Sequence, residues 1–448
     1  MTAEEYTLQY FHGALPDADA DKLLVNRGDF LIQSQLVNSK QLRFDANSNN
    51  NNQNKATTTT APMKTAIEDR LILAVRCGAR VRRWQIQRCA ESDHGGGVRL
   101  LGKRFDSIQQ MVNYYQRRNL ETARGELIRL RRAIPKGRHC LTHADIRLIK
   151  KIGSGAYGTV YRGLLIKENR AIAVKRIGLD MCGGDMERCL KRLLKEASVM
   201  QLYDHPNIVK FFGYVIDRAP YLLAMELCTG GSVEDKLRYA AQNITIARRI
   251  DMCCQASRGL SYLHSKNCIH RDLATRNCLL AGAVLKLADF GMCRAKPVYK
   301  IDLSKPQNVR WLAPEVWRTG ETCFATDIYA FGIMLWEFFE IPYTMPYANW
   351  KASLVKERVM SGYRMPAPKA MPPIIGVVMR HCCAQTQRAR PTAQELNKQL
   401  ERINAIPVIL IYRIKSKEWP QEHMTKKFRQ ETITKTISTT TQRKRSVE

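Results

Sequence analysis

Aspartate and asparagine residues gather in two short stretches in the second half of the chain. Within Cys268–Asn277, Asp272 precedes Asn277 by five positions, and Asp289 follows as the first residue of an Asp-Phe-Gly sequence. An aspartate can orient a hydroxyl group and accept its proton, and the side-chain oxygens of Asp and Asn are ligands that Mg²⁺ favours. The pattern predicts magnesium-assisted phosphoryl transfer, with Asp272 as the base and Asn277 and Asp289 as the metal ligands.

A glycine-rich stretch upstream could hold the phosphates of a nucleotide. Gly153, Gly155 and Gly158 have the spacing of a hairpin whose backbone closes over phosphate groups. This spacing alone is weak evidence, because any glycine-rich hairpin could produce it. Lys175 strengthens the interpretation, since it ends an apolar strand, Ala171–Lys175, that follows at the expected distance.

Together these motifs resemble those of the protein kinases, and the resemblance is continuous over residues 146–405. The entry segment Leu141–Ile146 is similar to that of the Fes/Fer group of cytoplasmic tyrosine kinases. The resemblance implies ATP and Mg²⁺ as cofactors, Lys175 as the ligand of the α- and β-phosphates, and Glu196 as its ion-pair partner. It also implies a nucleotide site made of Ile152, Gly153, Ser154, Gly155, Gly158, Val160, Ala173, Lys175, Met225, Glu226, Cys228 and Leu279.

Two features concern the residue that accepts the phosphoryl group. Ala274 stands where Ser/Thr kinases commonly have a Lys, and Arg276 follows it, as in tyrosine kinases whose Arg supports the phosphate region. The stretch Val309–Glu315 resembles the tyrosine-substrate platform, although Asn308 replaces its usual proline. The expected activity is transfer of the γ-phosphoryl group of ATP to protein tyrosine. Two alternatives are an inactive kinase-fold scaffold and Ser/Thr specificity.

A regulatory site is expected in the loop between Asp289 and Glu315. Tyr299 has the spacing of the family's activating autophosphorylation site. Its phosphate would carry about −1.5 to −2 charges and could pair with Arg271. The alternative is an ordinary loop tyrosine.

The N-terminal part, residues 8–135, resembles an SH2 domain. The expected elements are the helices Asp17–Leu24 and Phe105–Tyr115 and the strands Gly28–Ser34, Leu71–Val75, Val81–Ile86 and Leu127–Leu130. The expected fold class is α+β: an SH2-like domain, with a central antiparallel sheet flanked by two helices, followed by a bilobal protein-kinase domain.

Two residues depart from the SH2 pattern where phosphotyrosine should bind. Gln33 and Asp17 stand where such domains usually have arginines, and neither side chain can replace the charged, two-pronged contact with phosphate. We expect weak or defective phosphotyrosine binding, so the ligand could be non-phosphorylated or unusual. Arg82 and Arg83 could compensate in part. An Asn/Thr-rich insertion at residues 47–61 is expected to be disordered and to weaken the pocket further.

The chain is strongly basic, with 72 Lys and Arg against 41 Asp and Glu and a formal net charge of +31. This charge alone would suit acidic peptides, anionic membranes or nucleic acid. The kinase resemblance favours protein substrates bearing tyrosine, and no nucleic acid is expected. Residues 136–145 are expected to link the domains. Residues 415–448 are expected to form a basic, disordered tail that could meet an anionic membrane.

Targeting signals and cysteines bear on location. No secretory signal opens the chain, position 2 is not Gly, and the apolar run 406–412 is too short to cross a bilayer. The 14 cysteines include no Cys-x-x-Cys pair, which favours free thiols in a reducing compartment. The expected location is cytoplasmic, with peripheral membrane association through the tail as an open alternative.

Overall fold

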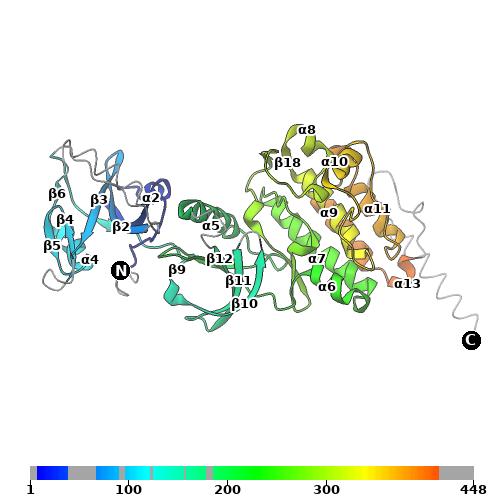
Figure 1. Cartoon of the computed structure of the whole chain (residues 1–448), viewed down its shortest axis with the longest axis horizontal. Helices are drawn as coiled ribbons and strands as arrows, with labels where there is room; N and C mark the ends of the chain where they lie inside the picture. The colour runs from blue at the N-terminus through cyan, green and yellow to red at the C-terminus, as the bar shows by residue number, and fades with distance from the viewer. Residues whose placement is uncertain are drawn as a thin grey trace, which may run out of the picture. The chain divides into compact units, whose positions relative to one another are not determined.

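The computed structural model describes residues 8–38, 67–89, 96–121, 125–155, 158–177 and 185–412 (Figure 1). Two structural units are present, one holding the chain up to Gln201 together with Phe211–Leu227, the other holding Leu202–Lys210 and the chain from Cys228 onward. The segments 47–61 and 415–448, which the sequence predicts to be disordered, lie outside the described residues. Within the described ranges, no helix is both long enough and apolar enough to cross a membrane.

The first part of unit 1 is a six-stranded sheet with the order β5-β4-β3-β2-β1-β8. Strands β1 to β5 pair antiparallel in sequence order, and β8 pairs with β1 in parallel. A separate small hairpin pairs β6 with β7. The strands are β1 (Asp29–Asn38), β2 (Ile67–Cys77), β3 (Arg80–Arg88), β4 (Val98–Leu100), β5 (Lys103–Phe105), β6 (Leu120–Glu121), β7 (Leu127–Ile128) and β8 (Arg132–Ala133).

Alternation along β1 and β2 builds the core of this sheet. Phe30 and Ile32 lie opposite Val75 and Leu73, and all four side chains are fully buried. Because alternate residues of a strand face the same side, these four form one apolar face. The helix α4 (Ile108–Arg117) adds its buried side chains to the same core. A second, shorter helix, α2 (Asp17–Leu23), precedes β1.

Two of the two-residue strands correct the sequence-based prediction. The predicted closing strand Leu127–Leu130 is only the short β7, and the edge of the main sheet is β8 instead. In the predicted linker, β9 (Cys140–Leu141) joins the second six-stranded sheet of unit 1, beside β13. Strands of two residues form because their partners are already in place, and they are too short to show a period in the sequence.

The second part of unit 1 is a curled sheet with one long helix. Its strand order is β10-β11-β12-β14-β13-β9, and α5 packs against β13 and β14. The helix begins after Asp185, whose carboxylate accepts a hydrogen bond from the Arg188 amide at 3.0 Å. The elements are β10 (Ile146–Gly155), β11 (Gly158–Leu165), β12 (Arg170–Ile177), α5 (Met186–Met200), β13 (Phe211–Val215) and β14 (Tyr221–Glu226).

One cysteine differs from the prediction of free thiols. Twelve cysteines in the described part of the chain are free, but Cys189 on α5 is disulfide-bonded. The prediction is wrong at this position, because a covalent bond to a second sulfur has taken up the Cys189 thiol.

Unit 2 is mainly helical and is built around α9 (Phe324–Phe339). Every α9 residue from Thr326 to Phe339 is buried, as expected for a helix that is apolar on nearly all sides. Both α7 and α11 pack against it. The remaining elements are α6 (Val233–Ala240), α7 (Ile246–Ser265), β15 (Cys278–Ala281), β16 (Val284–Leu287), β17 (Val298–Lys300), α8 (Pro314–Thr319), β18 (Glu321–Cys323), α10 (Ala352–Met360), α11 (Pro373–Cys382), α12 (Ala393–Asn404) and α13 (Val408–Ile411).

Candidate active site

Asp327 of α9 fixes the backbone of the loop around Asp272 through hydrogen bonds. The Asp327 carboxylate accepts hydrogen bonds from the backbone amides of His270 and Arg271, at 2.7 and 2.8 Å, and from the His264 ring at 3.0 Å. Burial alone would raise the pKa of Asp327, but these hydrogen bonds and the nearby histidines hold it below its ordinary value. The charged carboxylate therefore fixes the loop, in which Arg271 adopts a left-handed φ of 71°.

Asp272 lies buried at the centre of three side-chain donors. Its Oδ1 accepts from Arg276 at 2.5 Å and from Asn308 at 2.6 Å, and its Oδ2 accepts from the Asn277 amide at 2.8 Å. The loop thus brings together the predicted base, the predicted phosphate-supporting arginine and one predicted metal ligand. Asn308 is an addition, since its position had indicated only a departure from the usual proline.

Asn277 and Asp289 also lie close to each other, as expected for two ligands of one cation. The Ala288 amide donates to the Asn277 backbone carbonyl at 2.8 Å, which places the next residue, Asp289, beside Asn277. Asp289 has a left-handed φ of 60°, and its Oδ1 accepts from the Gly291 amide at 3.3 Å. Because the Asn277 side-chain nitrogen faces Asp272, its side-chain oxygen is available to a cation.

These donors suit Mg²⁺ bound together with a nucleotide. Among the described residues, no group of three or more His, Cys, Asp or Glu could hold a metal ion by itself. Mg²⁺ commonly takes one or two protein oxygens and completes its shell with phosphate and water. One carboxylate and one amide oxygen therefore fit an ion whose remaining ligands come from ATP.

In unit 1, the predicted pair of Lys175 and Glu196 is present. The Lys175 ammonium donates to both Glu196 carboxylate oxygens at 2.8 Å, and both side chains are buried. Lys175 lies opposite Val160 on the neighbouring strand, and Ala173 lies opposite Met225. The prediction that Glu196 pairs with Lys175 is confirmed.

The glycine-rich turn joins β10 to β11, as the sequence predicts. Ser154 pairs with Thr159, and Gly158 has a φ of 138°. A Cβ atom on Gly158 would lie 2.5 Å from the Arg176 carbonyl oxygen, so a side chain cannot be accommodated there without movement. Of the predicted nucleotide-site residues, those up to Glu226 lie in unit 1, on β10, β11, β12 and β14. Cys228 and Leu279 belong to unit 2.

Glu337 is a site residue that the sequence analysis missed. Its buried carboxylate accepts from the Thr275 hydroxyl at 2.7 Å and from the Trp311 ring nitrogen at 2.9 Å. Burial raises the pKa of Glu337. The carboxylate joins the catalytic loop to the predicted substrate platform, and the Arg276 guanidinium lies 4.2 Å from the centre of the Trp311 ring. The available signal was a single Glu inside the otherwise apolar run Ile333–Phe339.

Tyr299, the predicted phosphorylation site, lies on β17 among cationic side chains. The guanidiniums of Arg271 and Arg294 each lie 4.6 Å from the centre of its ring, and the Lys296 ammonium lies 5.4 Å away. Burial and then the like charge of Arg294 lower the pKa of Arg271. An anion placed here would relieve that repulsion. Arg271 therefore lies close enough to Tyr299 for the predicted pairing with a phosphate, which stays a prediction.

The predicted phosphate site of the N-terminal sheet is occupied by internal contacts. Gln33 is fully buried and donates to the Asp17 carboxylate, and Gln35 donates to the same oxygen at 3.1 Å. Arg83 lies 3.0 Å from Asp17 and 2.5 Å from Asp21. Two carboxylates therefore already pair with the Arg83 guanidinium, and compensation by Arg82 and Arg83 for the missing arginines stays a prediction.

Comparison with known proteins agrees with this geometry. Residues 146–400 match the family model for protein tyrosine and serine/threonine kinases, so the chain belongs to the protein kinase family.

Individual relatives indicate which group of protein kinases the chain resembles. Tyrosine-protein kinase Fer of Homo sapiens is 33% identical over 397 residues, which cover 87% of this chain and 43% of Fer. The Fer kinase of Rattus norvegicus is 31% identical over 399 residues, covering 88% and 44%. Tyrosine-protein kinase transforming protein Fps of avian sarcoma virus (strain PRCII) is 31% identical over 396 residues, covering 87% and 67%. The chain belongs to this Fer and Fps group, and it spans less than half the length of the Fer proteins.

Proposed function

We propose that this protein is a non-receptor protein tyrosine kinase, which transfers the γ-phosphoryl group of ATP to a tyrosine hydroxyl. The arrangement around Asp272 is the observation that carries the proposal. Arg276 contacts the carboxylate and also stacks on Trp311 of the platform, whereas Ala274 offers no cation at the position where Ser/Thr kinases have one. The similarity to Fer and Fps tyrosine kinases points to the same acceptor.

In this mechanism each side chain has a separate task. Asp272 orients the tyrosine hydroxyl and accepts its proton, as the hydroxyl oxygen bonds to the γ-phosphorus and ADP leaves. Arg276 supports the phosphate region, and Lys175, held by Glu196, positions the α- and β-phosphates. Asn277 and Asp289 would hold Mg²⁺, which neutralises charge on the phosphates. Most of the acceleration is expected from positioning and electrostatic stabilisation.

The test compares the full chain with its Asp272→Asn variant on a tyrosine copolymer. Loss of the proton acceptor should reduce phosphate incorporation by at least about a hundredfold, since general-base catalysis contributes 10²–10⁴-fold. Glu357→Gln, on the exposed side of α10, is the control for removal of a carboxylate. Equal phosphate incorporation by wild type and Asp272→Asn would favour the alternative that the protein is an inactive kinase-fold scaffold. Phosphoserine or phosphothreonine in the product would establish Ser/Thr specificity.

We also propose that Tyr299 is a regulatory autophosphorylation site. Arg271, Arg294 and Lys296 surround the ring, so a phosphate there would gain several cationic partners. Arg271 follows His270 in the catalytic loop, and such pairing would connect the modification to Asp272.

For residues 8–135 we propose an SH2-like domain with weak or defective phosphotyrosine binding. The antiparallel strands β1 to β5 and the helices α2 and α4 support the fold. The contacts among Asp17, Gln33 and Arg83 support the loss of binding, because Asp17 takes the place that a phosphate would need. The proposed ligand of this SH2-like domain is therefore a non-phosphorylated or otherwise unusual one.

The domain limits and the location belong to the same proposal. Residues 136–145 link the SH2-like domain to a kinase domain at residues 146–405, and the family match at residues 146–400 supports the latter. A cytoplasmic location is proposed from the likeness to the Fer and Fps kinases. Membrane association through the tail is a prediction about residues outside the described ranges.

A further inference from the structure

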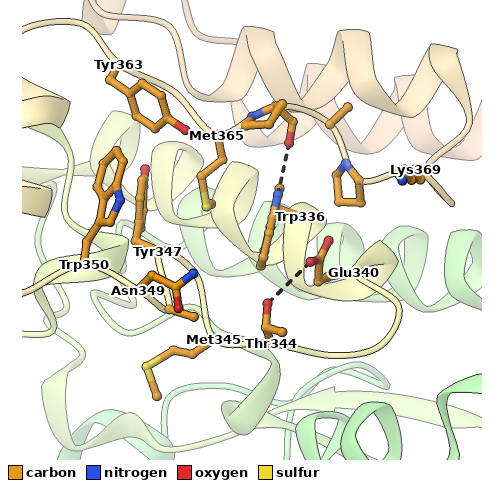
Figure 2. A pocket seen from close by; sticks show the side chains of 14 residues that line it. Trp336, Glu340, Thr344, Met345, Tyr347, Asn349, Trp350, Tyr363, Met365 and Lys369 are labelled. Atoms are coloured by element: carbon orange, nitrogen blue, oxygen red, sulfur yellow. Dashed lines mark hydrogen bonds between the residues drawn. The ribbon is translucent and has the colours of Figure 1, made fainter.

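A cavity of about 370 Å³ lies in unit 2. Its walls come from the end of α9, the loop before α10 and the loop after α10 (Figure 2). Three aromatic rings gather on one side: Trp350 lies 5.7 Å from Tyr347 and 4.8 Å from Tyr363, between ring centres. Figure 2 shows these three rings together on the same side of the cavity.

Glu340 gives this cavity an acidic group. It caps the C-terminal end of α9 and accepts a long hydrogen bond, 3.4 Å, from the Thr344 hydroxyl. Burial raises the pKa of Glu340, and the Thr344 hydrogen bond acts in the opposite direction. Lys369 is the basic residue among those that line the cavity, and Figure 2 shows it on the same side as Glu340, away from Tyr347, Trp350 and Tyr363.

Figure 2 shows Glu340 next to Trp336, across the cavity from Tyr347, Trp350 and Tyr363. A carboxylate beside an aromatic ring is a receptor for a cationic side chain. Aromatic faces attract Lys and Arg head groups and also cover their methylene chains. Met345 and Met365 add adaptable apolar surface to the same cavity.

The described chain ends next to this cavity. The Tyr412 hydroxyl donates to the Ala370 carbonyl at 3.2 Å, and Ala370 directly follows the lining residue Lys369. Ile411 is buried, so the end of α13 is anchored. The segment that follows, residues 413–448, has ten Lys and Arg against four Asp and Glu. Five extended residues reach roughly 17 Å, which brings Arg413, Lys415 and Lys417 within range.

We propose that the basic segment following Tyr412 folds back into this cavity of its own chain, with one Lys or Arg head group on Glu340 and its methylene chain against the Trp336 ring. Within the part of the chain that the structure describes, Glu340 forms no ion pair, so the cation supplies a charge partner, and its methylene groups cover apolar surface of the cavity. Because the segment is tethered at Tyr412, its effective concentration at the cavity is high, and a weak contact is sufficient. This inference does not depend on the acceptor residue of the kinase.

Hydrogen–deuterium exchange of the full chain tests the proposal. Backbone amides of residues 344–350 and 363–369 should exchange about tenfold more slowly in wild type than in Glu340→Gln. A variant combining Arg413→Gln, Lys415→Gln and Lys417→Gln should lose the same protection. Adding Glu340→Gln to that variant should cause no further loss of protection, because both sets of changes remove the same contact.

Matched controls separate this contact from a general effect of charge. Glu357→Gln removes an exposed carboxylate of α10, and Arg443→Gln, Lys444→Gln and Arg445→Gln together remove the same charge from the far end of the segment. Neither should change the protection. A synthetic peptide of residues 413–420 should restore protection to the variant with Arg413, Lys415 and Lys417 replaced, but not to Glu340→Gln.

Three outcomes would overturn the proposal. The first is equal exchange in wild type and the near-segment variant. The second is the same loss from the distant charge changes, which would show a diffuse electrostatic effect. The third is protection that rises with protein concentration, which would show that the segment enters a second copy of the chain.

Discussion

At the scale of single residues, Asn308 shows how one substitution can change an active site. The usual tyrosine-kinase residue at this position is proline, whose side chain has no hydrogen-bond donor. The Asn308 amide instead donates to the Asp272 carboxylate at 2.6 Å. We infer that Asn308 is a positioning residue, because it restricts the orientation of the proposed base.

Replacing Asn308 by Ala should lower kcat roughly five- to tenfold, since one hydrogen bond to a charged group is lost. The KM for ATP should stay the same, because Asn308 does not belong to the nucleotide site. Steady-state kinetics of the full chain measure both constants. Gln307→Ala changes the preceding half-buried side chain, which donates to the Asp302 and Lys305 carbonyls and not to Asp272, and serves as the control. An unchanged kcat would show that Arg276 and Asn277 position Asp272 without help.

The contacts of Asp17 lead to a second prediction at this scale. Combining Asp17→Ala with Gln33→Arg should raise affinity for a phosphotyrosine peptide at least tenfold, because the new guanidinium and Arg83 would both face the phosphate. Fluorescence polarisation with the full chain gives the dissociation constant. Asp19→Ala is the matched control, since Asp19 pairs with Lys22 instead. Ordinary micromolar binding by the wild type would contradict the proposed defect.

At the scale of elements, β17 and β18 place Tyr299 where it can act on the catalytic loop. Tyr299 lies opposite Thr322, whose hydroxyl donates to the Tyr299 carbonyl at 2.9 Å. This pairing fixes the backbone of the tyrosine beneath Arg271 and Arg294. A phosphate would therefore meet cations already in position.

Tyr299→Phe should remove most of the activation that follows incubation with ATP and Mg²⁺, a loss of roughly tenfold if one or two charge-assisted hydrogen bonds form. Activity before incubation should change little. The measurement is the initial rate together with phosphate incorporated per chain, and Tyr239→Phe, whose ring is 85% exposed, is the control. Unchanged activity and incorporation in Tyr299→Phe would show that this tyrosine has no regulatory role.

The helices and strands differed in how well they could be predicted from the sequence. The helix Ile108–Arg117 and strands β1 to β3 could be predicted because their apolar residues repeat with a clear period. The short β8 and β9 could not, since pairing with another strand decides their structure. In the site, Asp272, Asn277 and Asp289 were found from spacing, whereas Glu337 depends on contacts that only the folded chain creates.

At the scale of the whole molecule, buried charge links stability to pH. Arg390 donates to both oxygens of Glu315 at 2.6 and 2.8 Å, which ties α8 to the segment before α12. Asp327 holds the catalytic loop from within α9. Its folded-state pKa is lowered, so its contribution to stability is present above the unfolded pKa of about 3.9 and is lost as the pH falls through the folded value.

Asp327→Asn should therefore lower the melting temperature at pH 7 by about 5–10 °C, which corresponds to roughly 2–3 kcal/mol for a unit of this size. The difference between wild type and variant should shrink as the pH approaches 4 and below. Differential scanning calorimetry measures both effects. Asp204→Asn removes an exposed aspartate and should change the melting temperature little at any pH. A difference that is constant with pH would show that the charge of Asp327 contributes nothing.

The guanidinium of Arg310, in the predicted substrate platform, donates to the backbone carbonyls of Pro346, Tyr347 and Trp350. The last two residues also form a wall of the aromatic cavity. An acceptor protein bound at the predicted platform and a side chain bound in the cavity would therefore both act on the hydrogen bonds of Arg310. If Arg310 couples the two binding events, the acceptor protein changes the affinity of the cavity for its side chain by the same factor by which that side chain changes the affinity for the acceptor protein.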